Sequence, residues 1–172
     1  FLPSKAAIMA ITPLRLRRDG QPGTCTRSSS RAQLRFKKGS LETATATAKY
    51  LRENDAVKVG TLHVTSFRPF PGPQIVEALK NVKAIAVIER MDNPIAQSNP
   101  LTAEIKAAFA DALSGAPGYP NIDHAPVIYS ASAGLGSRDV RPGDYVAAVE
   151  HLRANKPRRF FVLGIVHPLA LT

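Results

Sequence analysis

Residues 83–89, KAIAVIE, decide the fold class because they form a continuous apolar run of strand length. Such a run is typical of a strand covered by helices on both faces, whereas a strand with one wet face alternates apolar and polar residues. Residues 159–166, RFFVLGIV, repeat the pattern near the end of the chain. The sequence therefore predicts buried strands in the sheet of an α/β domain.

Helical patterns alternate with these strands along the chain. Residues 40–54, SLETATATAKYLREN, place Leu41, Ala44, Ala48 and Leu51 at helical spacing, which predicts a helix with a narrow buried stripe. The other expected elements are a strand at 57–67, a helix from Pro73, a helix after Pro100, a strand at 125–132 and a helix that buries Tyr145, Val146, Val149 and Leu152. This alternation predicts a mostly parallel sheet with helices on both faces, a three-layer α/β/α sandwich.

The charge of the chain is concentrated at its beginning. The formal net charge is +10, and residues 1–40 hold nine Lys or Arg against one Asp, whereas residues 41–172 hold fourteen against twelve acidic residues. Residues 1–38 also lack a sustained apolar period, so we expect a basic, poorly packing extension before a domain at 39–172. An organellar transit peptide, a basic arm for phosphate backbones and an artefact of gene prediction are the three interpretations of this extension.

Cysteine content and hydropathy exclude several classes of protein. Cys25 is the only cysteine, so this chain by itself supplies no internal disulfide, four-thiolate zinc site or iron–sulfur cluster. We interpret Cys25 as an incidental thiol and expect a reducing, cytoplasmic setting. No apolar run approaches the roughly 18 residues that a membrane-spanning helix needs, and we expect a soluble or peripheral protein.

Three arginines lie just beyond the ends of predicted strands. Arg68 and Arg90 come directly after a strand, and Arg138 lies in the loop that follows the strand at 125–132. Ligands of open α/β sheets bind beyond the carboxyl ends of the strands, which makes this region the candidate site. Guanidinium groups suit an anion, but salt bridges or a contact with a neighbouring domain or subunit are the interpretation that we favour. The candidate residues are Arg68, Arg90, Gly134, Gly136, Ser137 and Arg138.

The loop AGLGSRD, residues 133–139, matches a dinucleotide-binding fingerprint only in part. Asp139 stands where a third glycine is needed, and the following helix is expected to begin only near Pro142. A tight turn that packs closely is therefore the expectation for this loop, rather than a phosphate site.

The sequence supplies no recognisable set of catalytic groups. The four histidines, at 63, 124, 151 and 167, have no metal-ligand spacing to another histidine or to the cysteine, and His63 inside a strand is interpreted as structural. A nucleophile elbow and a P-loop are both missing. We accordingly predict no catalytic, cofactor-binding or metal-binding residue in this chain.

Four stretches, in this order and spacing, resemble the second domain of pyruvate:ferredoxin (flavodoxin) oxidoreductase and related 2-oxoacid oxidoreductases. They are KYLRENDAVKVGTLHVTSFRPFP (49–71), AIAVIER (84–90), GLGSRDVRP (134–142) and FFVLGIV (160–166). The resemblance runs from about Gly39 to the end of the chain. It implies a fold similar to the carboxy-terminal domain of transketolase, with five strands, the first of them at AQLRFKKGS (32–40).

The resemblance also implies a dimeric, multi-domain whole enzyme, too long to be this chain alone. Such an enzyme oxidatively decarboxylates pyruvate to acetyl-CoA, and its 4Fe-4S clusters pass electrons to ferredoxin or flavodoxin. Its thiamine diphosphate, with Mg, binds between two other domains through a Gly-Asp-Gly signature and paired asparagines. The nearest match here is Gly143-Asp144-Tyr145 without such a pair, so no thiamine diphosphate, Mg, cluster or coenzyme A is expected on this chain.

Two stretches depart from the family pattern. ERMDNPI (89–95) stands where members usually have DRTKEPG, so that only Arg90 and Pro94 match closely, and VHPLA (166–170) replaces the usual aspartate pair. We expect altered contacts at both places.

The function predicted from these observations is that of a non-catalytic interface domain of a 2-oxoacid oxidoreductase. We expect it to be inactive toward pyruvate alone and to contact other domains or subunits through Arg68, Arg90 and the loop 134–138. One alternative is nucleic-acid binding by the basic residues 1–38. A small anion- or coenzyme A-binding domain that uses the three arginines is the other.

Overall fold

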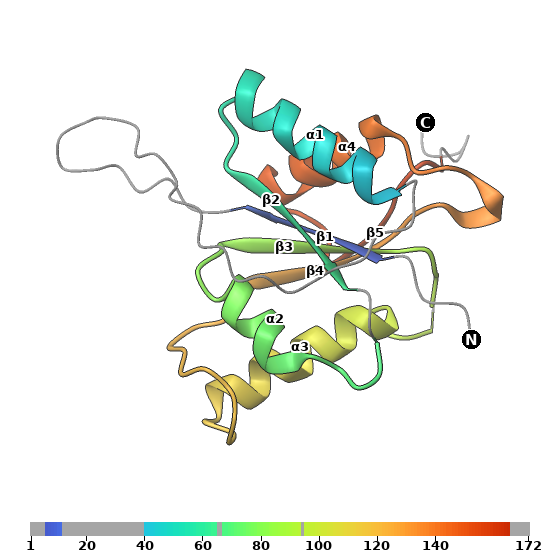
Figure 1. Cartoon of the computed structure of the whole chain (residues 1–172). Coiled ribbons are helices and arrows are strands. Elements are labelled where there is room, and N and C mark those ends of the chain that lie inside the picture. Colours follow the sequence, from blue (N-terminus) through green and yellow to red (C-terminus); the bar gives the residue numbers. More distant parts are fainter. Residues whose placement is uncertain (1–5, 12–39, 65–66, 94, 166–172) are drawn as a thin grey trace, which may run out of the picture.

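The computed structural model of the chain describes residues 6–11, 40–64, 67–93 and 95–165 (Figure 1). Three of the expectations fall elsewhere. Cys25, most of the basic extension and the part of the expected first strand before Ser40 lie outside the described residues.

Five strands form one mixed sheet in the order β2-β1-β3-β4-β5. Strands β2 (Val59–Val64), β3 (Ala84–Glu89), β4 (Val127–Ser132) and β5 (Phe160–Val162) run in the same direction, whereas β1 (Ala6–Ile11) is antiparallel to both of its neighbours. The prediction of an α/β fold with a mostly parallel five-stranded sheet is confirmed.

Strand β1 corrects one expectation. We expected residues 1–38 to pack poorly, but residues 6–11 lie between β2 and β3, with Ile8 and Met9 fully buried. The physical reason is local: AAIMAI is a six-residue apolar run long enough for one strand, although the stretch around it is basic and rich in turn-forming residues.

Helices cover both faces of the sheet, as a three-layer sandwich requires. Helices α1 (Ser40–Asn54) and α4 (Pro142–Arg153) lie on one face, and α2 (Gly72–Leu79) and α3 (Pro100–Leu113) lie on the other (Figure 1). Two apolar clusters fill the spaces between the layers, one on each face. Within the described part of the chain, no helix is long and apolar enough to cross a bilayer.

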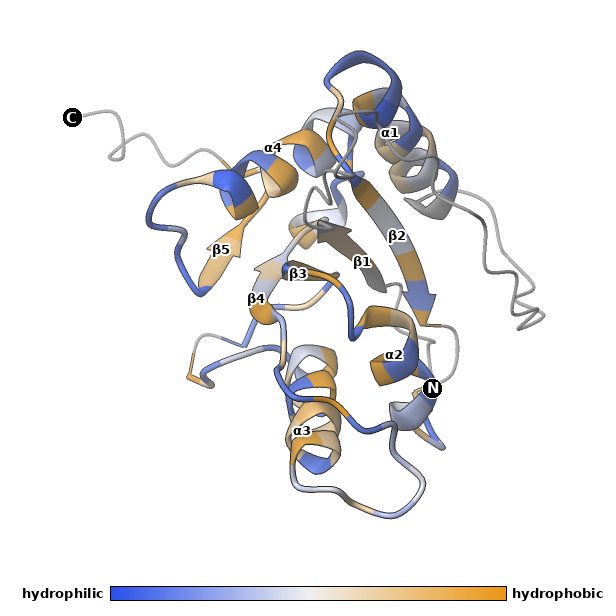
Figure 2. Ribbon diagram, turned by 90° about the vertical axis from the view of Figure 1, so that its left-hand side faces the viewer, coloured by the Kyte–Doolittle hydropathy of each residue, from blue (hydrophilic) through white to orange (hydrophobic). Residues whose placement is uncertain are grey.

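The two strands predicted from continuous apolar runs differ in length and burial. All six residues of β3 are buried, as the run KAIAVIE predicts. Strand β5 lies at the edge of the sheet and ends at Val162, before Gly164 turns the chain with a φ of +75°. It is therefore shorter than the apolar run 159–166 suggests, although Figure 2 shows it almost wholly in the hydrophobic colour.

Candidate functional site

The ends of two parallel strands build the candidate site. Strands β3 and β4 are paired so that Glu89 lies opposite Ser132, the last residue of each strand. The loops that follow both strands consequently leave the sheet side by side. We call this region, with the loops 90–99 and 133–141, the carboxyl edge.

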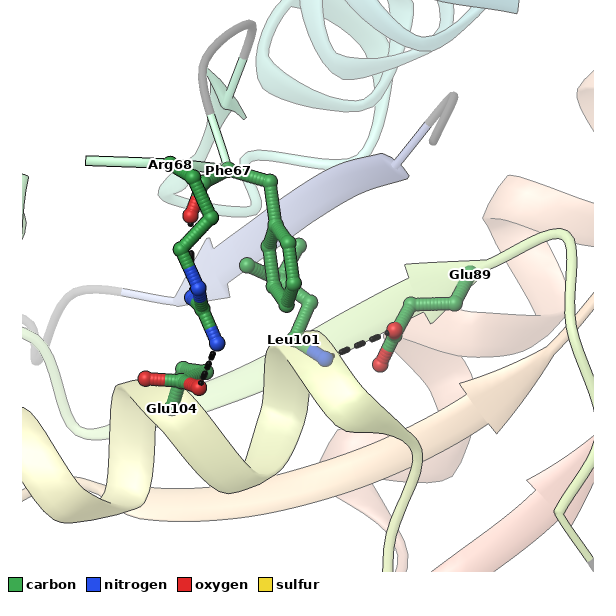
Figure 3. A network of polar contacts seen from close by, with 5 residues as sticks. All are labelled: Phe67, Arg68, Glu89, Leu101 and Glu104. Atoms are coloured by element: carbon green, nitrogen blue, oxygen red, sulfur yellow. Dashed lines mark hydrogen bonds and ion pairs between the residues drawn. The ribbon is translucent and has the colours of Figure 1, made fainter. Parts of the chain in front are cut away.

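Glu89 is the most deeply buried charged residue of this edge, at 3% exposure. Its carboxylate accepts a hydrogen bond from the backbone N–H of Leu101 at 2.9 Å (Figure 3). It also accepts hydrogen bonds from the backbone N–H (3.0 Å) and the hydroxyl (2.9 Å) of Thr102. The first N–H groups of a helix have no partner within the helix, and the N-terminus favours negative charge. Glu89 therefore caps α3 from the neighbouring strand.

Asn99 precedes α3 and is displaced from its usual capping role by Glu89. Its side-chain amide donates to the Met91 carbonyl and to the Ser132 hydroxyl, both at 3.0 Å, and its backbone N–H donates to the Ser130 hydroxyl at 3.0 Å. The Ser132 hydroxyl in turn donates to Asp92 at 3.3 Å. These bonds fix the start of the loop after β3 to the end of β4.

Burial raises the pKa of Glu89 above its ordinary value of 4.5, and the hydrogen bonds from Leu101 and Thr102 offset part of this rise. The folded chain therefore binds the Glu89 proton more tightly than the unfolded chain does. The stabilisation that results is complete below pH 4.5 and is lost as the pH rises through the raised pKa.

A titration of stability tests this pKa. We expect the difference in free energy of unfolding between the wild type and Glu89→Gln to be most favourable to the wild type below pH 4.5 and to shrink as the pH increases. Urea unfolding between pH 3.5 and 8 measures it, and subtracting the variant removes the titration of all other groups. A difference that grows with pH would show that the pKa of Glu89 is lowered instead.

Arg90 connects the loop after β3 to the loop after β4. Its Nε donates to the Gly134 carbonyl at 3.0 Å. Gly134 and Gly136 both have positive φ, +68° and +62°, so the loop turns tightly at two places. The prediction that AGLGSRD is a tight turn is thus confirmed by its geometry.

Arg138 and the start of α4 fix the far side of the same loop. The Nη1 of Arg138 donates to the Gly164 carbonyl at 3.0 Å, just beyond β5. The backbone N–H of Arg141 donates to the Asp144 carboxylate at 2.8 Å, in a capping box at the N-terminus of α4. The helix begins at Pro142, well after the glycines, as the sequence predicts.

Two glycines of this loop make a matched pair for mutation. A Cβ at Gly134 would lie 3.2 Å from the Arg138 carbonyl oxygen and 3.4 Å from the Arg90 Cγ, whereas one at Gly136 would meet nothing within 4 Å. Gly136→Ala bears only the cost of the left-handed conformation, about 1–2 kcal/mol. We expect Gly134→Ala to cost more, as measured by the midpoint of thermal unfolding, and equal losses would contradict the close packing.

Arg68 is engaged elsewhere, on α3. Its Nη2 is 2.6 Å from the Glu104 carboxylate, its Nη1 donates to the Phe67 carbonyl at 3.0 Å, and its guanidinium lies 4.3 Å from the centre of the Phe67 ring (Figure 3). The structure therefore brings Arg90 and Arg138 to one loop, with Gly134, Gly136 and Ser137 between them, while Arg68 binds the helix on the other face.

Residues that the sequence analysis passed over hold the edge together. They are Glu89, Asn99, Thr102, Ser130 and Ser132, all buried. Two signals were present in the sequence: a glutamate ends a wholly apolar strand, and serines at 130 and 132 alternate along β4, which puts them on one face. Neither signal names the partner, because the partner lies on an element distant in the sequence.

The histidines that the structure describes do not form a site of their own. His63 lies in β2, and burial lowers its pKa, which favours the neutral ring. His151 on α4 packs its ring 4.1 Å from that of Phe161 and bonds the Arg158 carbonyl at 2.9 Å. Among the described residues, no three His, Cys, Asp or Glu side chains gather as they would around a metal ion.

Comparison with known proteins gives one family. Residues 38–145 match the model of pyruvate:ferredoxin oxidoreductase core domain II. All six candidate residues, from Arg68 to Arg138, fall within the matched part. So do the buried residues that cap α3.

Individual relatives agree with this match. A pyruvate-flavodoxin oxidoreductase of Klebsiella pneumoniae is 37% identical over 116 residues, 67% of this chain and 9% of that protein. A putative pyruvate-flavodoxin oxidoreductase of Synechocystis is 33% identical over 132 residues, and a pyruvate:ferredoxin oxidoreductase of Moorella thermoacetica is 30% identical over 134 residues. These alignments cover 76% and 77% of this chain and 10% of each relative. The chain spans about a tenth of the length of the relatives it matches.

Proposed function

The chain belongs to the family of pyruvate:ferredoxin oxidoreductase core domain II, and from this premise we propose that it is a structural interface domain of a pyruvate oxidoreductase. The whole enzyme, of which this chain would form one part, decarboxylates pyruvate oxidatively to acetyl-CoA and delivers the electrons to ferredoxin or flavodoxin in the cytoplasm. Thiamine diphosphate, Mg, 4Fe-4S clusters and coenzyme A bind to its other domains. The contribution of this chain is to hold those domains in place.

The observation that carries the proposal is the fixed shape of an exposed loop. Gly136, Ser137 and Arg138 are exposed to solvent, yet Arg90 and Arg138 tie the loop to both neighbouring segments. An exposed loop held in one conformation needs little ordering when a partner binds it. Polar loops at the carboxyl edge of a sheet commonly meet a neighbouring domain.

The residues nearest to a cofactor signature are committed to other contacts, which supports the same role. Asp144 of the stretch Gly143-Asp144-Tyr145 caps α4 through the Arg141 N–H, and Tyr145 is buried in the core. They do not fit thiamine diphosphate, and no step of the reaction is assigned to them.

Association with the rest of the enzyme tests the proposal. The 172-residue chain is co-expressed with the K. pneumoniae relative from which the matched stretch has been deleted, and the mixture is separated by gel filtration. We expect the two to elute together. Arg138→Glu should weaken the complex at least tenfold, and Arg158→Glu, which reverses an exposed arginine just before β5, should not.

Each outcome of this experiment has one meaning. A wild-type chain that elutes alone would contradict the interface role. Equal binding of the two arginine variants would keep the role but remove the loop 134–138 from the interface.

Calorimetry tests the non-catalytic part of the proposal. We expect titration of thiamine diphosphate and Mg into the 172-residue chain to give no heat of binding, because Asp144 and Tyr145 are occupied within α4. A full-length pyruvate-flavodoxin oxidoreductase stripped of its cofactor serves as the positive control. Micromolar binding by the short chain would overturn the assignment.

The alternatives stay predictions. The basic residues from 12 to 38 lie outside the described residues, so the nucleic-acid hypothesis rests on the sequence alone. The anion or coenzyme A hypothesis needs free guanidinium groups, and Arg68, Arg90 and Arg138 each already contact protein groups.

A further inference from the structure

Helices α1 and α4 pack side by side on one face of the sheet (Figures 1 and 2). Side chains of both helices line a groove. Its volume is about 590 Å³. Three features of its lining are used below: a small residue, Ala46, a large exposed one, Tyr50, and the start of α4 at Pro142 and Val146.

The chemistry of the lining suits apolar side chains. Tyr50 is 58% exposed, and Ala46 beside it on α1 is also exposed. The Thr47 hydroxyl donates to the Thr43 carbonyl at 2.7 Å, so it is used within the helix. Among the described residues that line the groove, Glu42 is the one charged residue, so these residues offer an anionic ligand no cation.

The groove continues the interface proposed above. Pro142, at its α4 side, directly follows Arg141 of the capping box and lies four residues after Arg138 of the loop 134–138. A partner domain that contacts the loop 134–138 can therefore contact the groove as well.

Resting on the proposed function, we propose that this groove receives an apolar segment of another domain of the same oxidoreductase. The matched stretches cover about a tenth of each relative, so most of each relative lies in other domains. The basic residues that precede α1 match the groove poorly, since residues 12–39 hold eight Lys or Arg and the described lining residues are uncharged apart from Glu42. A second copy of the chain would carry the same Glu42 to the contact.

A matched pair of substitutions on α1 tests the proposal. Ala46→Arg fills the groove with a long charged side chain, whereas Thr45→Arg places the same side chain on the preceding residue, which is exposed and does not line the groove. In the co-expression assay with the truncated K. pneumoniae relative, we expect Ala46→Arg to weaken the complex at least tenfold and Thr45→Arg to leave it unchanged. Both variants should unfold at the wild-type temperature.

The outcomes separate this proposal from the one on which it rests. Failure of the wild type to bind contradicts the interface role as a whole. Binding by both variants equal to the wild type contradicts the groove alone. A fall in unfolding temperature for Ala46→Arg but not for Thr45→Arg would show that a segment of this chain already fills the groove. Dimerisation of the wild type that Ala46→Arg abolishes would show that a second copy of the chain binds there. Either result overturns the proposal.

Discussion

Replacing Glu89 by leucine is expected to lower the free energy of unfolding by about 3–5 kcal/mol. Leucine fits the apolar surroundings of β3, so the loss does not come from a cavity. It comes from the backbone N–H groups of Leu101 and Thr102 and the Thr102 hydroxyl, which lose their acceptor at a buried helix terminus. A buried donor left without a partner costs about 1–3 kcal/mol. Relief from burying the carboxylate offsets part of the sum.

Glu104→Leu is the control for this prediction. Glu104 is also on α3 and also bound to a polar partner, Arg68, but the pair is exposed to solvent. Exposed ion pairs contribute about 0–1 kcal/mol, so the control should lose no more than that. Urea unfolding monitored by circular dichroism measures both variants. A Glu89→Leu protein as stable as the control would show that the carboxylate does not cap α3.

Tyr145→Ala should cause a loss of similar size, about 3–5 kcal/mol, by a different mechanism. Tyr145 lies on α4 and is 1% exposed, and its ring packs in the apolar cluster between α4, α1 and the sheet. Removing it leaves a cavity that its neighbours fill only in part. Because natural domains are stable by about 5–15 kcal/mol, the variant should lie close to unfolding at 37 °C.

Tyr50→Ala makes the matched comparison, since it removes the same side chain from the other helix of this layer. Tyr50 is 58% exposed and should cost less than about 0.5 kcal/mol. The midpoint of thermal unfolding measures both tyrosine variants. Equal losses would mean that Tyr145 is not buried in solution, or that the groove holds a segment that covers Tyr50.

The sequence predicted the sheet and its covering helices because buried strands and helices need apolar residues at characteristic spacings. The run at β3 and the stripe at Ala44, Ala48 and Leu51 were both confirmed, since all of these residues are buried. Strand β1 was missed because six apolar residues carry little weight in a stretch of forty residues that holds nine Lys or Arg and one acidic residue. Its antiparallel direction depends on pairing with distant strands, which no local pattern reports.

The sequence predicted which loops meet at the carboxyl edge, but it did not predict the contacts between their residues. The rule that loops after parallel strands meet at one edge correctly placed Arg90 near the loop 134–138. The same rule did not show that Arg68 lies apart from Arg90 and Arg138, because its partner Glu104 is 36 residues away in the sequence. Nor did it find the pair of Glu89 and Thr102, because a carboxylate capping a helix from another element has no fixed spacing in the sequence.

Pyruvate-dependent reduction of flavodoxin tests the central claim most directly. It is measured for the 172-residue chain alone, for the truncated K. pneumoniae relative alone and for the two together. We predict turnover only in the mixture, because we propose that the chain contributes a structural interface to the enzyme and no reacting group. Turnover by the chain alone, or a truncated relative that is equally active without it, would contradict the account.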